Sequence, residues 1–391
     1  MRWLEIAPRV MLLLLAAAPL SAETTSPEAL ARLKAVGREG QGNPAASKAW
    51  KEVVARGPSA LPEILAAMDG AEATAANWLR TAVDAIAERA LAAHEELPAA
   101  QLERFVRQTR HDGAARRLGY ELLCRVDPKA PDRLLPGMLQ DPSPELRRDA
   151  VAAVIQEADA LLEKDARDAA RAAYRKALTG ACDRDQVDRL VKQLDKLGVK
   201  VDVAGHFGFV TRWLLAAPFD NSREAGFDAA YPPEKGVNPA AVYKGKNGAE
   251  VRWTAHTTTN PYGVVNLNQA VGKQQGVVAY AYAVVESPAE RPVQVRAGSQ
   301  NGIRIFLNGK EICHRDEYHH CMEVDQYVAS TTLKAGRNEL LVKVCQNEQK
   351  EDWAQQWSFQ VRLCDAVGAA VPFTPVALTS DNPPKRGEGK P

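Results

Sequence analysis

The apolar and polar positions of the chain follow a helical period first and a strand period afterwards. Between residues 23 and 198, Ala-rich amphipathic segments recur between Pro and Gly breaks, and no segment alternates apolar with polar residues. One segment places Trp78, Val83 and Ile86 on a single stripe, as in a helix with one buried face. This pattern predicts an all-helical domain over residues 23–198.

The helical region carries a weak internal repeat. Arginines recur at Arg80, Arg116 and Arg147, at steps of 36 and 31 residues (80 to 116 and 116 to 147). The turn at residues 141–144, followed by ELRRDAVAAVI, resembles the start of a HEAT repeat. Helix-pair repeats of this length bury one face only by stacking on their neighbours. We therefore expect an N-terminal α-solenoid of HEAT-like helical repeats.

Beyond Gly198 the pattern changes to short runs rich in β-branched and aromatic residues, separated by turns. Nine short strands at close spacing favour two packed antiparallel sheets over a parallel sheet. We therefore expect an antiparallel β-sandwich over residues 199–371. Its predicted strands are Val210–Ala217, Ala249–His256, Gly263–Leu267, Val277–Val285, Val293–Ala297, Ile303–Leu307, Gln326–Thr332, Glu339–Cys345 and Ser358–Cys364.

The stretch from Gln294 to Ile312, QVRAGSQNGIRIFLNGKEI, constrains the sandwich most. Alternating segments are separated by two Asn-Gly dipeptides, Asn301-Gly302 and Asn308-Gly309. Asn and Gly tolerate the positive φ that tight turns require. The pattern predicts three short antiparallel strands side by side, a β-meander.

This hairpin resembles the one in galactose-binding-like β-sandwiches, the jelly-roll modules found beside bacterial glycosidases. Together with HFGFVTRWLLAAPFDN, LLVKVCQNEQ and WSFQVRLCD, the chain resembles secreted bacterial proteins that pair HEAT-like repeats with such a sandwich. The resemblance implies recognition or assembly outside the cytoplasm. Calcium-dependent sugar-binding relatives carry paired acids where this chain has Gln300-Asn301, which argues against calcium-dependent binding through this turn.

Both ends of the chain differ from the two domains. Arg2 and Arg9 precede an apolar run from Val10 to Ala18, which predicts a secretory signal peptide over residues 1–22. Because this run is shorter than the roughly 20 apolar residues that span a bilayer, we expect a secreted or periplasmic protein with no transmembrane span. The Pro-, Gly- and charge-rich end predicts a disordered tail over residues 372–391.

Charge and motifs narrow the classes of function. Lys and Arg number 50 against 49 Asp and Glu, so no net field favours a nucleic-acid partner. The sequence contains no GxSxG elbow, no phosphate-binding loop and no HExxH helix. We therefore expect a protein that is not an enzyme.

Export would place the six cysteines in an oxidising compartment, where disulfides form. Cys345 and Cys364 both point to the polar side of their predicted strands, so a cross-strand disulfide is expected if these strands are adjacent. Cys313 and Cys321 would close a short loop. Cys124 and Cys182 lie in helical sequence, where a buried free thiol is expected at least as often as a disulfide.

The loop between Cys313 and Cys321 concentrates histidines beside carboxylates. His314, His319, His320 and Glu317 could bind zinc or another borderline cation as a structural metal. Their spacing matches no standard metal motif, so the alternative is a hairpin tip with a structural or partner-contact role. No other cofactor is expected.

Aromatic and amide side chains gather in the predicted loops of the sandwich. Aromatic faces stack on sugar rings and amides bond to hydroxyls, so a carbohydrate site could use Trp353, Trp357, Tyr318, Tyr327 and Gln355. The alternative is that tryptophans such as Trp357 belong to the core. Trp353, in the polar run EQKEDWAQQ, is the strongest candidate for an exposed ring.

These features favour an exported non-catalytic binding or scaffold protein. The helical repeats would bind a protein partner, and the sandwich would recognise a glycan or a cell-envelope protein. One alternative is a purely structural interaction protein without sugar affinity. Another is a glycoside-acting enzyme that uses the acidic loop 220–234, although a solvated loop or a structural calcium site is the commoner arrangement of such residues.

Overall fold

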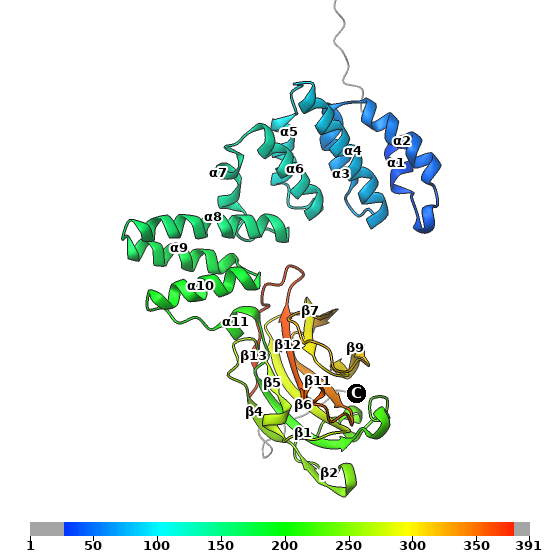
Figure 1. Ribbon diagram of the computed structural model, residues 1–391, viewed down its shortest axis with the longest axis vertical. Helices are drawn as coiled ribbons and strands as arrows, with labels where there is room; N and C mark the ends of the chain where they lie inside the picture. The colour runs from blue at the N-terminus through cyan, green and yellow to red at the C-terminus, as the bar shows by residue number, and fades with distance from the viewer. Residues whose placement is uncertain (1–26, 379–391) are drawn as a thin grey trace, which may run out of the picture. The chain divides into compact units, whose positions relative to one another are not determined.

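The structure is a computed structural model that describes residues 27–378, so the predicted signal peptide and residues 379–391 lie outside the described residues. Contacts divide the chain into two compact units, Met1–Leu134 and Leu135–Pro391. Helices give way to strands near Gly198, as the sequence predicts, but this change falls inside the second unit (Figure 1).

The first unit is helical throughout its described residues. Consecutive helices pack in pairs, and contacts of α2 with α4 and of α3 with α6 join one pair to the next. The pairs bury the apolar stripes, and Leu79, Val83 and Ile86 on α4 are fully buried. The helices are α1 (Pro27–Lys34), α2 (Asn43–Ala55), α3 (Leu61–Ala67), α4 (Ala73–Ala92), α5 (Ala99–Arg107), α6 (Gly113–Val126) and α7 (Ala130–Leu134).

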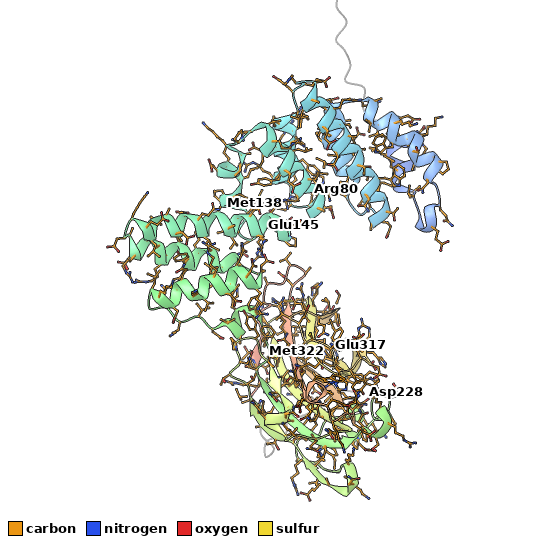
Figure 2. All side chains as sticks on the ribbon, viewed as in Figure 1. Arg80, Met138, Glu145, Asp228, Glu317 and Met322 are labelled. Carbon is orange, nitrogen blue, oxygen red and sulfur yellow. The ribbon has the colours of Figure 1, made fainter. Side chains whose placement is uncertain are left out.

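The repeated arginines have two different structural roles. Arg116, at the start of α6, is buried and donates from Nε to the Val106 carbonyl at the end of α5, over 2.8 Å. Arg147 is likewise buried and donates to the Gly180 carbonyl at the end of another helix, over 2.7 Å. Arg80 is exposed and lies 3.9 Å from Asp84 on the same helix (Figure 2). Only two of the three arginines therefore join helices.

The second unit begins with a further group of packed helices, α8 (Pro144–Glu163), α9 (Arg167–Gly180) and α10 (Arg184–Lys196), followed by the short α11 (Val203–Phe207). Their shared core includes Tyr174, Leu190, Phe207 and Phe209. Phe207 and Phe209 belong to the segment that leads into the first strand. Helices and sheets are therefore parts of one compact unit.

Two antiparallel sheets bury a common apolar core, to which β6, β7, β11 and β12 contribute alternate residues. The larger sheet has the order β4-β1-β6-β11-β8-β9, with β13 also beside β6, and the smaller has the order β10-β7-β12-β5. The strands of the larger sheet are β1 (Arg212–Asp220), β4 (Thr254–Thr257), β6 (Val277–Ser287), β8 (Ile303–Leu307), β9 (Lys310–Arg315), β11 (Gly336–Gln346) and β13 (Thr374–Pro375). Those of the smaller sheet are β5 (Val265–Asn266), β7 (Arg291–Ser299), β10 (Tyr327–Leu333) and β12 (Ser358–Cys364).

All nine predicted strands overlap observed ones, and the prediction at 249–256 covers two of them, β3 (Glu250–Arg252) and β4. The sequence pattern missed β2 (Val242–Lys244), which pairs with β3, and it also missed β13; β9 is the third strand of the predicted meander. Two short helices, α12 (Pro232–Lys235) and α13 (Leu267–Ala270), lie in the connections.

The predicted meander is correct at one turn and wrong at the other. Asn308 and Gly309 both have positive φ and join β8 to β9 as a hairpin. The turn at Asn301-Gly302 instead carries the chain from the smaller sheet to the larger, because β7 pairs with β10 and β12 whereas β8 pairs with β11 and β9. The apolar faces of β7 and β8 therefore meet across the core rather than lying in one sheet.

The outer face of the larger sheet is also buried. Residues between β1 and β4, including Phe227 and Trp253, cover it and form a second apolar cluster with Tyr280 and Tyr282 of β6. The end of the described chain joins this cover, because Thr374–Pro375 pair with β6 and Leu378 packs on the same cluster. The predicted disordered tail is thus wrong for its first residues, which are held by a strand pairing and an apolar contact.

The predicted disulfides are wrong. Cys313, Cys321, Cys345 and Cys364 are free thiols. Cys345 on β11 and Cys364 on β12 belong to different sheets, so they are not cross-strand neighbours. Both are buried, and burial raises the pKa of the Cys345 thiol to about 12.

Among residues 27–378 no helix combines the length and apolar character that crossing a membrane requires.

Candidate functional site

Three loops that are distant in sequence meet at one end of the sandwich. The Gln300-Asn301 turn receives two backbone hydrogen bonds from the histidine loop: the amide of His320 donates to the Gln300 carbonyl over 3.2 Å, and that of His319 donates to Asn301 Oδ1 over 3.1 Å. Asn301 in turn donates from Nδ2 to the Gln356 carbonyl over 2.8 Å. The turn between the sheets is therefore tied to both the histidine loop and the tryptophan-containing loop.

A polar cleft of about 450 Å³ lies beside this turn. A smaller hollow of about 140 Å³ shares three of its lining residues, Asn268, Lys273 and Gln355. We call the two together the amide cleft, because amide side chains dominate their lining. The lining residues are Asn266, Asn268, Lys273, Gln274, Gln275, Gln300, Gln346, Asp352, Gln355, Gln356, Trp357 and Ser358.

Short helical segments position the walls of the amide cleft. On one wall, Asn266 caps α13 by accepting from the amide of Gln269 over 3.2 Å. The opposite wall is the 3-10 helix at residues 352–355, and Asn268 joins the two by donating from Nδ2 to the Gln355 carbonyl over 2.7 Å.

The base of the cleft contains polar atoms that the protein does not pair. Trp357 Nε1, Gln346 Oε1 and Gln300 Oε1 are buried and have no hydrogen-bond partner among residues 27–378. Leaving such an atom unpaired costs about 1–3 kcal/mol. Buried polar groups are usually satisfied, so three exceptions around one cleft mark it as a site with unused hydrogen-bonding capacity.

An exposed tryptophan stands beside the cleft. Trp353 is 62% exposed and belongs to the 3-10 helix that also supplies Asp352 and Gln355. Its ring meets the His319 ring edge to face, with centroids 5.4 Å apart. His319 donates from Nε2 to Asn347 Oδ1 over 2.8 Å, and this bond fixes the orientation of the imidazole that contacts the indole.

The structure brings together only part of the predicted carbohydrate set. Gln355 and Trp357 line the amide cleft, although Trp357 is fully buried in the core, and Trp353 lies beside the cleft on the same 3-10 helix as Gln355. Tyr327 is buried and donates its hydroxyl to Glu317, and Tyr318 accepts from Asn221. These two tyrosines do not line the cleft.

The predicted metal ligands are not gathered into one site. His314 bonds to Glu311 over 2.6 Å, His319 bonds to Asn347, and His320 bonds to Gln326 over 2.8 Å. Glu317 is 3.8 Å from His320. Nowhere in residues 27–378 do three or more His, Cys, Asp or Glu side chains lie in an arrangement that could hold a metal ion. The histidine loop instead supports the turn and Trp353.

The acidic loop 220–234 mainly covers the larger sheet. Glu234 is paired with the buried ammonium of Lys343 over 2.9 Å. The pKa of Asp220 is held below its usual value by hydrogen bonds from Ser222 and by Lys246. Asp228 remains exposed (Figure 2). These three acids of the loop therefore differ widely in their surroundings.

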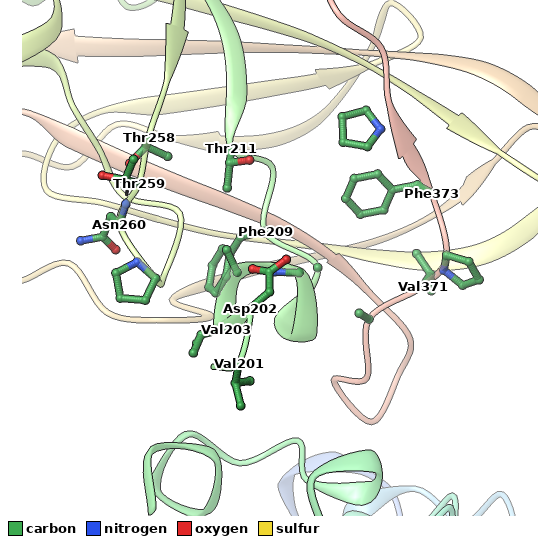
Figure 3. Close-up of a pocket in the computed structure, with 17 residues that line it drawn as sticks. Val201, Asp202, Val203, Phe209, Thr211, Thr258, Thr259, Asn260, Val371 and Phe373 are labelled. Carbon is green, nitrogen blue, oxygen red and sulfur yellow. Dashed lines mark hydrogen bonds between the residues drawn. The ribbon is translucent and has the colours of Figure 1, made fainter. Parts of the chain in front are cut away.

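A larger hollow lies elsewhere, a groove of about 700 Å³ between α11, the segment after β4 and the segment before β13 (Figure 3). Val203, Phe209 and Phe373 make much of its lining apolar. Two of its polar side chains bond to their own loops, since Asp202 accepts from the Gly205 amide and Asn260 accepts from the Tyr262 amide. The amide cleft is smaller but offers more unpaired polar atoms, and it is the stronger candidate site.

Several cleft residues were missed by the sequence reasoning. The segment from the end of β5 to the start of β6 contributes Asn266, Asn268, Gln274 and Gln275. Its sequence NLNQAVGKQQ is as rich in amides as the loop that contains Trp353, and this composition was the available signal.

No known family model matches the chain, and no curated protein matches it.

Proposed function

We propose that this protein is an exported, non-catalytic recognition protein that binds a glycan at the amide cleft. The exposed Trp353 ring beside a cleft lined by amides carries the proposal. An indole ring offers an apolar face to the C–H face of a sugar, and amides both donate to and accept from hydroxyls. The proposal includes a jelly-roll sandwich of the galactose-binding-like type.

The paired helices support the second part of the proposal, an HEAT-like solenoid that binds a protein partner. Stacked helix pairs present long continuous surfaces, which suit extended protein contacts. Such a protein would hold a glycan with the sandwich and a protein partner with the helical repeats. The leader-like sequence at residues 1–22 supports a secreted or periplasmic location.

Glycan binding by the full chain tests the proposal. On a glycan array the wild type should retain a defined set of sugars, and Trp353→Ala and Gln355→Ala should each weaken binding about tenfold, the equivalent of about 1.4 kcal/mol. Val242→Ala, which trims another exposed apolar side chain away from the cleft, is the matched control and should bind normally. Absence of any bound glycan would favour a structural interaction protein without sugar affinity.

One observation favours a glycoside-acting enzyme as the second candidate. Burial, together with the nearby carboxylates of Glu224 and Asp228, raises the pKa of Asp316. A carboxyl group with a raised pKa near a second carboxyl group is the arrangement that glycoside hydrolysis uses. Hydrolysis of a substrate panel, abolished by Asp316→Asn and by Asp228→Asn, would establish this alternative. An inactive wild type would remove it.

A further inference from the structure

We infer that the amide cleft binds an uncharged sugar by accepting hydrogen bonds from its hydroxyls directly, without a bridging divalent cation. This inference rests on the proposed function and names the ligand chemistry of the same site. It follows from the direction of the hydrogen bonds that the cleft residues already make.

The protein uses the amide nitrogens of the cleft for its own contacts. Four side chains donate from nitrogen to backbone carbonyls, over 2.7 to 3.2 Å: Asn268 to Gln355, Gln274 to Val271, Gln346 to Ala354 and Gln355 to Lys350. A carbonyl oxygen can only accept, so each of these contacts fixes which end of the amide is the nitrogen. In each of these four amides, the nitrogen makes the contact with the backbone carbonyl and the oxygen takes no part in it.

Acceptor oxygens consequently predominate among the unused groups. Gln300 Oε1 and Gln346 Oε1 are buried without a partner among the described residues. A ligand that satisfies them must donate hydrogen bonds. Sugar hydroxyls do so, and a hydroxyl can at the same time accept from a donor such as Trp357 Nε1, the third unpaired atom.

The charges of the cleft argue for a neutral ligand. Its lining contains one cation, Lys273, and one carboxylate, Asp352. The sulfate or carboxylate of an acidic sugar is disfavoured here, because its negative charge would face the partially negative oxygens of the amides. A calcium site typically uses several carboxylates among its oxygen ligands, and here one carboxylate shares the cleft with an ammonium group.

The ligand must displace or turn surface amides to reach the buried atoms. Gln356 is exposed at the rim and its Oε1 accepts from Gln300 over 3.2 Å. Gln355 Nε2 also contacts a side chain, Asp352 Oδ1, but it is held by the Lys350 carbonyl as well, whereas the Gln356 side chain contacts only another side chain among the described residues. Gln356 is thus the side chain best placed to move when a sugar enters.

Binding of neutral sugars to the full chain tests the inference. The glycans retained by the wild type are titrated calorimetrically in EDTA and in CaCl₂, alongside sulfated, uronic-acid and O-methylated versions. We expect affinities within about twofold between EDTA and calcium, and weaker binding of the acidic versions. O-methylation removes the hydroxyl donors and should weaken binding at least about tenfold, the scale of a hydrogen bond lost from a buried group.

A pair of matched variants separates the cleft from the fold. Gln346→Met removes a buried acceptor and should weaken binding about tenfold. Gln360→Met replaces another buried glutamine, which donates to the Glu323 carbonyl outside the cleft, and should leave affinity within about twofold if its melting temperature matches.

The outcomes distinguish this inference from the proposed function. Binding that EDTA abolishes and calcium restores, or that O-methylation leaves intact, would overturn the inference while the glycan-binding function stands. Equal losses in both glutamine variants at equal melting temperatures would also overturn it. Absence of any glycan binding would overturn both.

Discussion

Lys343 lies on β11 with its side chain fully buried. Its ammonium group donates to the carbonyls of Phe227 and Ala229 and to Glu234 Oε1, over 2.8, 2.8 and 2.9 Å. All three N–H groups are therefore used. Alternation along β11 predicts that this lysine lies on a polar face of the sheet. The residues between β1 and β4 cover that face, and the hydrogen bonds and charge of Lys343 hold these residues on the sheet.

Replacing Lys343 by Ala should lower the free energy of unfolding by about 3–5 kcal/mol, because the buried Glu234 carboxylate would lose its cation at 2.9 Å and keep only the more distant Arg304, 3.9 Å away. Urea denaturation followed by tryptophan fluorescence measures the change. Lys310→Ala, which removes an exposed lysine from β9, is the control and should change the free energy by less than about 0.5 kcal/mol. A similar loss in the two variants would show that Lys343 does not carry this role.

The outer face of the smaller sheet is organised by one carboxylate between two strands. Asp325, just before β10, accepts from Arg296 on β7 and from Arg362 on β12 over 2.7 and 2.6 Å. Arg362 also donates to the Phe207 carbonyl over 3.3 Å and to the Gly368 carbonyl over 2.9 Å. This cluster connects the sheet to α11 and to the segment after β12.

Stability should depend on the ionisation of Asp325. Burial acts to raise its pKa, but hydrogen bonds and charges from Arg362 and Arg296 outweigh burial and leave the pKa below its usual value. The unfolded chain therefore takes up this proton first as the pH falls. The stabilisation is complete above the ordinary Asp pKa of about 3.9 and is lost as the pH falls further, through the folded pKa.

Asp325→Asn should lower the free energy of unfolding at pH 7 by about 1.5–3 kcal/mol, the scale of hydrogen bonds to a charged group. It should also flatten the fall in stability below pH 4. Urea denaturation at pH 7, 5, 4 and 3 measures both effects. Asp168→Asn, in an exposed pair with Arg171, should leave the profile close to that of the wild type. An unchanged slope in the Asp325 variant would contradict this assignment.

At the scale of the whole molecule, the compact units do not follow the change in sequence pattern. The helices α8–α10 share a core with Phe207, Phe209 and Tyr262, which precede or interrupt the strands. Arg184 on α10 lies over the Tyr262 ring, 4.5 Å from its centroid. The contacts therefore divide the chain at Leu134 and not at Gly198.

A fragment that begins at Leu135 should accordingly be more stable than one that begins at Val199. Without α8–α10, Phe207 and Phe209 lose the cover that buries them, at about 1.5–3 kcal/mol for each side chain. We expect a difference of at least about 3 kcal/mol in the free energy of unfolding, measured by urea denaturation. Equal stability of the two fragments would show that the helices and the sheets fold independently.

The sequence by itself determined most of the elements. An observed strand overlaps every predicted segment, and the hairpin at Asn308-Gly309 forms as expected, because periodicity and turn chemistry act between residues that are close along the chain. Composition also singled out Trp353 as an exposed ring, since no apolar neighbours in its loop could bury it.

Only the tertiary structure decided which elements meet. The same Asn-Gly chemistry that closes a hairpin at residue 308 carries the chain between sheets at residue 301, because the apolar faces of β7 and β8 are buried best across the core. The two cysteine strands proved to lie in different layers, and Lys343 proved to be covered. The amide cleft arises where Gln300, Gln346 and Gln355 converge, and such long-range proximity depends on strand order, which local periodicity does not encode.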